Sequence, residues 1–316
     1  MEKIMKRYGT PYKGSKNSIA KDIISFLPGG GTLVDLFAGG CAITHAALEA
    51  CDGIAPKWNE IICNDIDPLA ISLFRDCIDG KYTVENHKQW ISREDFHRMK
   101  DSNAWVRYCW SFGNNGLDYM YSREIEPWKR ALHGAYVLND CTLLEEIVGT
   151  IPGEHKSDLA AWIKANEDVL KEKYIAWYRG AYLKGIKTEY VFHLALPEGL
   201  QRLQGLQRLQ RLEGLQGPDI GRVKFSTKDY RNVEIPKGAI VYCDIPYQGT
   251  DCGCYEGFDR EAFFNWAANQ EARIYISSYR IDDVRFQCVW EKPKRNKCMG
   301  GGGKLVTERI YTQTGR

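Results

Sequence analysis

Short apolar runs that end in polar or glycine-rich turns alternate with helical patterns near the start of the chain. The first run, Thr32–Phe37, ends at Ala38–Gly40 and passes into a helical pattern over Ala42–Leu48. The second, Ile61–Cys63, precedes a helix that Pro68 opens. Two successive strand–helix units predict a parallel sheet with right-handed crossovers.

The pattern changes between residues 86 and 197, where aromatic and charged residues dominate and the periodicity is mostly helical. Strand patterns return at 222–225, 239–243, 273–278 and 305–312. The sheet is therefore expected to be completed after an insertion, giving an α/β fold. The expected parts are a first core segment (1–85), an inserted, mostly helical lobe (86–197), a repeat segment (198–217) and a second core segment (218–316).

The repeat segment places leucine at every third position and alternates it with glutamine, arginine and glycine. A step of three residues turns about 300° in an α-helix, so the leucines would not form one stripe. Gly205 and Gly214 weaken a helix further. A stacked or strand-like repeat and a loosely packed linker both remain open, and no catalytic role is assigned to the segment.

Charge and cysteine content exclude several classes of protein. The formal net charge of the 316 residues is only +2, so any affinity for nucleic acid must come from a local patch. No apolar run approaches the roughly 20 residues that span a bilayer, and the N-terminus lacks the pattern of a signal peptide. The 11 cysteines form no CxxC pair, which predicts free thiols in a cytoplasmic protein without a metal site. Cys252 and Cys254 are interpreted as two loop thiols.

Three motifs follow predicted strands and should meet at the carboxyl edge of the sheet, where ligands bind in open α/β folds. The turn Asp35–Gly40 suits a nucleotide-like ligand. Asp65, about 25 residues beyond it, stands where an acidic side chain accepts hydrogen bonds from ribose hydroxyls. The third motif is Asp244–Tyr247. Each has a plain alternative: a glycine turn that only starts a helix, or a strand-ending Asp-x-Pro turn.

The order of these motifs resembles the Dam-like family of adenine-N6 DNA methyltransferases, particularly its phage-type members. It runs from Pro11–Lys16 through DLFAGG, NDID and an insertion to DIPY. The resemblance implies a Rossmann-like S-adenosylmethionine-dependent sheet and an inserted DNA-recognition lobe. It also implies methyl transfer to N6 of a flipped-out adenine in double-stranded DNA, with S-adenosylhomocysteine as product. Enzymes of this kind act in the cytoplasm of bacteria or phage-infected cells, often in restriction-modification, and can act as monomers.

The resemblance makes Asp244, Ile245, Pro246 and Tyr247 the catalytic tetrapeptide. The adenine amine is a weak nucleophile because its lone pair is conjugated with the ring, so it needs acceptors such as the Asp244 carboxylate and the Ile245 carbonyl. Pro246 stiffens the turn, and Tyr247 stacks on the base. Most of the family has proline where Ile245 stands; we expect activity to survive because the backbone carbonyl is retained.

The resemblance also assigns the cofactor-binding residues. Tyr12 and Lys16 match the N-terminal motif that contacts the cofactor, with Lys16 near its carboxylate or the active-site edge. The remaining positions are the methionine-side turn, the ribose acceptor with its apolar neighbour, the acceptor for the adenine amine and the tetrapeptide aspartate: Asp35, Phe37, Ala38, Gly39, Asp65, Ile66, Asp229 and Asp244. A surface lysine is the alternative for Lys16, and a helix N-cap is the alternative for Asp229.

Two regions carry the residues expected to bind DNA. In the inserted lobe, aromatics on both sides of Asn115-Gly116 predict a hairpin with Asn114 and Asn115 near its tip. The residues that follow it, Arg123, Lys129 and Arg130, are expected to reach into a groove with them. Near the C-terminus, Lys294 and Arg295 precede a glycine-rich stretch that suits phosphate binding. A structural turn and a solvated hairpin tip are the respective alternatives.

Two other functions remain open at this point. An amino-methyltransferase could act on cytosine N4 or on an amine of RNA or protein, although cytosine-N4 enzymes usually carry serine in place of Asp244. A catalytically silent DNA-binding relative is the second, and Ile245 is its only support.

Overall fold

The computed structural model describes residues 7–182, 220–247, 257–295 and 305–315. These residues divide into two compact units. The first, here called the sheet unit, comprises the described residues up to 81, residues 99–117 and the described residues from 220 onward. The second, the helical unit, comprises 82–98 and 118–182. The Leu-Gln repeat lies outside the described residues.

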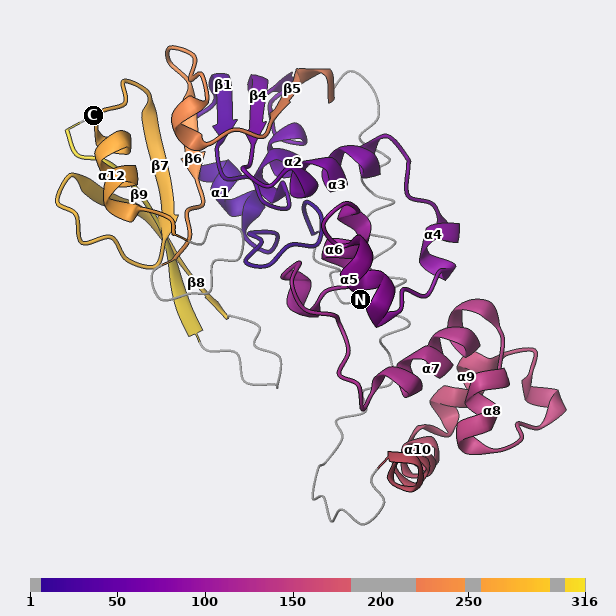
Figure 1. Ribbon diagram of the computed structural model, residues 1–316. Coiled ribbons are helices and arrows are strands. Elements are labelled where there is room, and N and C mark those ends of the chain that lie inside the picture. The colour runs from indigo at the N-terminus through magenta and orange to yellow at the C-terminus, as the bar shows by residue number, and fades with distance from the viewer. Residues whose placement is uncertain (1–6, 183–219, 248–256, 296–304, 316) are drawn as a thin grey trace. The chain divides into compact units, whose positions relative to one another are not determined.

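A seven-stranded sheet forms the centre of the sheet unit (Figure 1). Its strand order is β5-β4-β1-β6-β7-β9-β8. The strands are β1 (Gly30–Asp35), β4 (Trp58–Asn64), β5 (Val223–Ser226), β6 (Ile240–Cys243), β7 (Arg273–Ser278), β8 (Phe286–Arg295) and β9 (Leu305–Gln313). The first five strands in this order pair in parallel, whereas β9 is antiparallel to both β7 and β8. The predicted α/β fold with a mostly parallel sheet is confirmed.

Alternate side chains of the central strands enter two different hydrophobic clusters, which explains why these strands have continuous apolar sequences. On one face, Leu33 and Tyr242 pack with α1 (Ala20–Phe26) and α2 (Ala42–Leu48). On the other, Val34 and Val241 pack with α12 (Arg260–Ala268). Burial on both faces thus fixes the register in which the strands present their carboxyl ends.

The remaining helices of the sheet unit follow the cofactor motifs in sequence. α3 (Pro68–Ile78) begins after Asp67, whose carboxylate accepts a hydrogen bond from the backbone of Leu69 and caps the helix. α6 (Ala104–Cys109) is capped in the same way by Asn103. A small antiparallel pair, β2 (Cys51–Asp52) and β3 (Ala55–Pro56), precedes β4.

The helical unit contains helices α7 to α10 (Figure 1). Their apolar side chains form an aromatic and aliphatic cluster. These helices are α7 (Glu126–Leu138), α8 (Thr142–Val148), α9 (Leu159–Ala165) and α10 (Glu167–Tyr182), preceded by α4 (Val84–Lys88) and α5 (Arg93–Met99). Trp128 and Tyr174 are the largest buried members, and their rings lie 5.0 Å apart. A core of this kind suits the helical periodicity of the insertion.

One local expectation is wrong. Residues around Asn115-Gly116 form no hairpin: α6 is followed by a 3-10 turn, Phe112–Asn114, because the Asn103 cap starts a helix and Gly113 and Asn114 take positive φ angles. Lys294 and Arg295 end strand β8, and the glycine-rich stretch that follows them lies outside the described residues.

Candidate active site

The three motifs found in the sequence meet at one edge of the sheet. Strand β1 lies between β4 and β6, and the three are parallel, so Asp35, Asn64 and Cys243 end neighbouring strands at the same edge. From β1 the chain builds the sheet toward β4 and β5 on one side and toward β6 and β7 on the other. This reversal of direction creates the crevice in which doubly wound sheets bind ligands.

Asp65 shapes the glycine turn. Its Oδ2 accepts a hydrogen bond of 2.7 Å from the Gly39 backbone, and its Oδ1 accepts one of 2.9 Å from the Asp67 backbone. The side chain is fully buried. Asp65 thus holds the turn from inside, and the ribose contact expected for it stays a prediction.

The expected N-terminal motif packs on the same turn. A Cβ atom at Gly39 would lie 2.7 Å from the Tyr12 ring, and the φ of Gly39 is +48°, so only glycine fits there. The Thr10 backbone donates a 2.7 Å hydrogen bond to the Gly40 carbonyl. These contacts bring Tyr12 beside Gly39, and the contact with the cofactor expected for Tyr12 stays a prediction.

A pocket of about 310 Å³ opens beside this turn, at the carboxyl ends of β1, β4 and β5. Phe37, Ile66 and Asp229, all expected to bind the cofactor, line it together with Tyr230 and Phe258. The Ile66 side chain is 44% exposed, which makes it an apolar surface open to a ligand. Asp229 also caps a short 3-10 turn and pairs with Arg231, its two closest contacts to the guanidinium being 2.8 Å, so the expected N-cap role is present as well.

Asn64 was not singled out from the sequence, although it connects the strands around the pocket. Its amide nitrogen donates to the carbonyls of Leu36 and Lys228, and its amide oxygen accepts from Ser226 and the Lys228 backbone. All four bonds measure between 2.6 and 3.1 Å. The sequence offered one signal, a polar side chain ending a buried strand.

The two carboxylate oxygens of Asp35 differ in their hydrogen bonding. Oδ2 accepts hydrogen bonds from the Thr44 backbone and hydroxyl, at 3.0 and 2.7 Å. Oδ1 is buried and has no hydrogen-bond partner among the described residues. Burial raises the pKa of Asp35 to about 7, against the opposing effect of the Thr44 bonds. An ammonium group of a ligand would satisfy Oδ1.

The tetrapeptide aspartate forms a buried ion pair with the N-terminal lysine. Lys16 Nζ lies 2.6 Å from Asp244 Oδ1 and 4.7 Å from the centre of the Tyr247 ring. Burial raises the pKa of Asp244, while Lys16 opposes this effect. Burial alone would lower the pKa of Lys16, but Asp244 and Glu308 outweigh it, and the net shift is upward. Lys16 is therefore a charged residue of the site and not a surface lysine.

The rest of the tetrapeptide is anchored from two directions. The Ile245 side chain is buried in the hydrophobic cluster under α12, so an apolar side chain at this position also secures the turn. The Pro246 carbonyl accepts a 2.6 Å hydrogen bond from Arg260, the first residue of α12. Sequence analysis missed Arg260.

A second buried carboxylate, Glu308 of β9, lies next to Tyr247 and was also missed. It accepts hydrogen bonds from the hydroxyls of Tyr247 and Ser277. Lys294 Nζ is 2.5 Å from Glu308 Oε2. The signal available in the sequence was a carboxylate two positions before Ile310, at an inward-facing position of an apolar strand.

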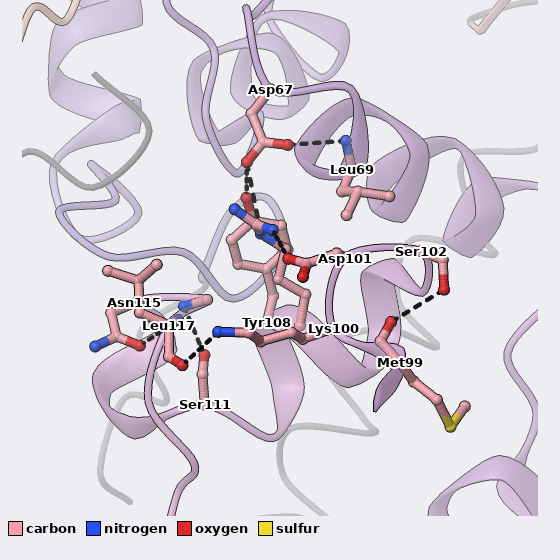
Figure 2. Close-up of polar contacts among 12 residues, drawn as sticks. Asp67, Leu69, Met99, Lys100, Asp101, Ser102, Tyr108, Ser111, Asn115 and Leu117 are labelled. Carbon is pink, nitrogen blue, oxygen red and sulfur yellow. Dashed lines mark hydrogen bonds and ion pairs between the residues drawn. The ribbon is translucent and has the colours of Figure 1, made fainter. Parts of the chain in front are cut away.

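Residues 99–117 contact Asp67 and Tyr12 within the sheet unit. The Tyr108 hydroxyl donates to Asp67, the cap of α3, and Arg107 approaches the same carboxylate at 3.9 Å (Figure 2). The Tyr108 ring lies 5.2 Å from the Tyr12 ring. Lys100 donates to the Leu117 carbonyl and closes the segment (Figure 2).

The residues expected to bind DNA differ in their exposure to solvent. The side chains of Arg123, Arg130 and Arg295 are exposed. Lys129 of α7 is buried, and Lys294 forms an ion pair with Glu308. The Asn114 amide donates to the Tyr108 carbonyl, and the Asn115 side-chain oxygen accepts from the Leu117 backbone. Both asparagines thus form hydrogen bonds that shape their own turn, and the DNA-binding role of the seven residues stays a prediction.

The described residues carry neither a metal-binding cluster nor a membrane-spanning helix. They contain no group of three or more histidine, cysteine, aspartate or glutamate side chains arranged to hold a metal ion. None of the described helices is long and apolar enough to cross a membrane. The eight described cysteines are free thiols, and Cys252 and Cys254 lie outside the described residues.

Residues 12–125 match the family of D12 class N6 adenine-specific DNA methyltransferases. Over this segment the chain is similar to D12-class adenine-specific DNA methyltransferases. The match covers Tyr12, Lys16, the glycine turn, Asp65 and the segment 99–117, while the tetrapeptide lies beyond it. No curated protein matches the sequence. The sheet order and the family together establish a Rossmann-like methyltransferase fold.

Proposed function

We propose that this methyltransferase transfers the methyl group of S-adenosylmethionine to N6 of an adenine that has been flipped out of duplex DNA. The single observation that carries the proposal is the placement of Asp244, beside Lys16 and Tyr247, at the sheet edge that holds the ligand pocket. The cofactor supplies an electrophilic methyl group on a positively charged sulfur.

The residues present fit this cofactor. The aromatic and apolar walls of the pocket, Phe37, Ile66 and Tyr230, suit its adenine ring, with Asp229 at the rim as acceptor for the amine. The buried Oδ1 of Asp35 suits its ammonium group. Tyr12, Ala38 and Gly39 would flank the methionine portion, and Asp65 would act chiefly by holding Gly39.

Catalysis by the tetrapeptide follows from its charges. Asp244 and the Ile245 carbonyl accept hydrogen bonds from the target amine and draw its nitrogen toward tetrahedral geometry. A carboxylate has about four acceptor sites, so Asp244 can bind Lys16 and the amine together. The raised pKa of Asp244 also suits it to take the proton that the methylated amine releases. Tyr247 stacks on the base, an interaction worth about 1 to 3 kcal/mol.

The test is transfer of labelled methyl groups to unmethylated genomic DNA, followed by nucleoside analysis. We expect label in N6-methyladenine. Asp244→Ala should reduce turnover by about 10³-fold while changing the cofactor Kd little, because its acceptor role belongs to the transition state. Asp282→Ala, which removes an exposed carboxylate of the same unit, is the matched control and should retain activity. Label in cytosine, no label in DNA, or unchanged turnover in Asp244→Ala would refute the proposal.

A further inference from the structure

Glu308 is a buried carboxylate to which the mechanism above gives no role. Its side chain has no exposed surface, although an unpaired buried carboxylate is strongly unfavourable. Four groups compensate for its burial. The Tyr247 hydroxyl and the Ser277 hydroxyl donate to Oε1, the latter at 2.7 Å, the Lys294 ammonium group is 2.5 Å from Oε2, and the charge of Lys16 adds an electrostatic attraction.

The charges identify donor and acceptor in this cluster. Burial would raise the pKa of Glu308, but Lys16 and Lys294 outweigh it, and the pKa is lowered. Burial raises the pKa of Tyr247 well above its usual value. At neutral pH Glu308 is therefore ionised and Tyr247 is a neutral phenol, so the hydroxyl donates to a full negative charge. Charge-assisted hydrogen bonds of this kind are roughly twice as strong as neutral ones.

The bond to Glu308 fixes the free end of the Tyr247 ring. The other restraints act on the ring itself: Tyr279 meets it edge to face at 4.5 Å, and Lys16 lies 4.7 Å from its centre. With its hydroxyl held by Glu308 as well, the ring is restrained at its centre, edge and tip. A stacking surface that is ordered before the substrate arrives binds it at a lower entropic cost.

We propose that Glu308 is a positioning residue for methyl transfer, holding Tyr247 in the orientation that stacks the target adenine beside Asp244. The proposal rests on the function proposed above. It explains why an ion cluster occupies a place where a well-packed apolar side chain would be at least as stabilising. Glu308 does not touch the reacting atoms and acts through the phenol of Tyr247.

Glu308→Gln is the first variant, because it keeps the shape of the side chain and removes the charge. With unmethylated genomic DNA as substrate, we expect kcat to fall about 10- to 100-fold, the loss typical of a reacting group displaced by about 1 Å, with the cofactor Kd within about twofold of wild type. Glu291→Gln makes the same change on strand β8, where the side chain is 61% exposed, and should leave kcat unchanged.

Tyr247→Phe and the double variant show whether Glu308 acts through the phenol. Tyr247→Phe keeps the stacking ring and removes only the hydroxyl, so it should reproduce most of the loss in kcat. In the double variant the two losses should not add. Full additivity, or wild-type kcat in Tyr247→Phe, would overturn the proposal, since a purely structural Glu308 predicts independent effects. If Glu308→Gln does not fold, Tyr247→Phe alone decides between these outcomes.

A structural measurement separates this proposal from the proposed function. A crystal structure of Glu308→Gln without DNA should show the Tyr247 ring rotated or disordered, while that of Glu291→Gln should show it in place. An unchanged, ordered Tyr247 in Glu308→Gln would overturn the positioning role even if the enzyme methylates adenine. If the wild-type protein does not methylate DNA, the proposed function is refuted, whereas a rotated Tyr247 in Glu308→Gln would still show that Glu308 orients the ring.

Discussion

Asp35 combines a structural role with an open acceptor in one carboxylate. Its Oδ2 secures the start of α2 through Thr44, and its buried Oδ1 has no hydrogen-bond partner among the described residues. Burial makes protonation favourable and raises the pKa to about 7. An ammonium group bound at Oδ1 would favour the ionised form and reverse this shift.

Cofactor affinity should therefore depend on pH through Asp35. Only the carboxylate can pair with the ammonium group, so below pH 7 binding must first remove a proton. We expect the Kd of S-adenosylmethionine, measured by calorimetry, to rise up to about tenfold per pH unit below pH 7 and to level off above it. Asp35→Asn should bind weakly with a flat profile between pH 5.5 and 7.5. A pH-independent Kd in the wild type would contradict this assignment.

The raised pKa of Asp35 also makes the stability of the fold depend on pH. Because the pKa of Asp35 is raised on folding, the stability it contributes is complete near pH 4 and is lost as the pH rises through 7. A ligand that pairs with the carboxylate offsets this loss. The rise in Tm on adding cofactor should accordingly be larger at pH 8 than at pH 6.

Whether the sequence reveals a residue of the site depends on where that residue lies along a strand. Asp35 is the last residue of one apolar strand and Asp244 directly follows another, so the periodicity places both at the ligand edge. Glu308 lies within β9, and nothing in one sequence shows that β9 brings it beside Tyr247. That contact depends on the insertion of β9 between β7 and β8, a property of the whole sheet.

Among elements, β4 determines the geometry of the cofactor edge through its last residue. Asn64 joins the turn after β1 to the segment after β5 with two donors and two acceptors. This buried amide uses both of its donors and both of its acceptor positions. No other side chain of the same size can therefore reproduce all four hydrogen bonds.

Asn64→Asp should destabilise the sheet unit while preserving the shape of the side chain. The variant faces two carbonyl oxygens with a carboxylate oxygen in place of the donor, which should lower the free energy of unfolding by about 3 kcal/mol in urea titrations. Asn269→Asp, at the exposed end of α12, makes the same chemical change and should cost less than about 1 kcal/mol. If both variants lowered the free energy of unfolding equally, the hydrogen bonds of Asn64 would not account for the loss.

The sequence predicted elements well where burial fixed the pattern and poorly where it did not. Strands β6 and β7 match their expected segments to within one residue, whereas β1 and β4 begin two and three residues earlier than expected. Strand β8 was missed because it is an edge strand whose side chains are mostly exposed, so it shows no apolar run. The Asn-Gly signal for a hairpin was outweighed by the Asn103 cap and by the contacts that Tyr108 makes with Asp67.

At the scale of the whole molecule, the insertion departs from its expected boundaries in one segment. Residues 99–117 belong to the sheet unit, where Tyr108 contacts Asp67 and Tyr12, and the helical unit is built from the chain on either side of them. A single sequence could show that an insertion exists, because the periodicity changes there. It could not show that the chain returns to the core within it, since this return rests on a few long-range contacts.

The helical unit offers a sharp test of DNA binding, because neighbouring residues of α7 differ in exposure. Arg130 is exposed and Lys129 is buried, and Arg123 is exposed just before the helix. If this unit binds phosphates, Arg123→Ala and Arg130→Ala should each reduce the slope of log K against log salt concentration by about 0.9 for a labelled duplex. Lys129→Ala should leave that slope unchanged and lower the Tm instead, because its charge does not reach the surface. A slope in Arg130→Ala equal to that of the wild type would remove this face of α7 from the DNA-binding surface.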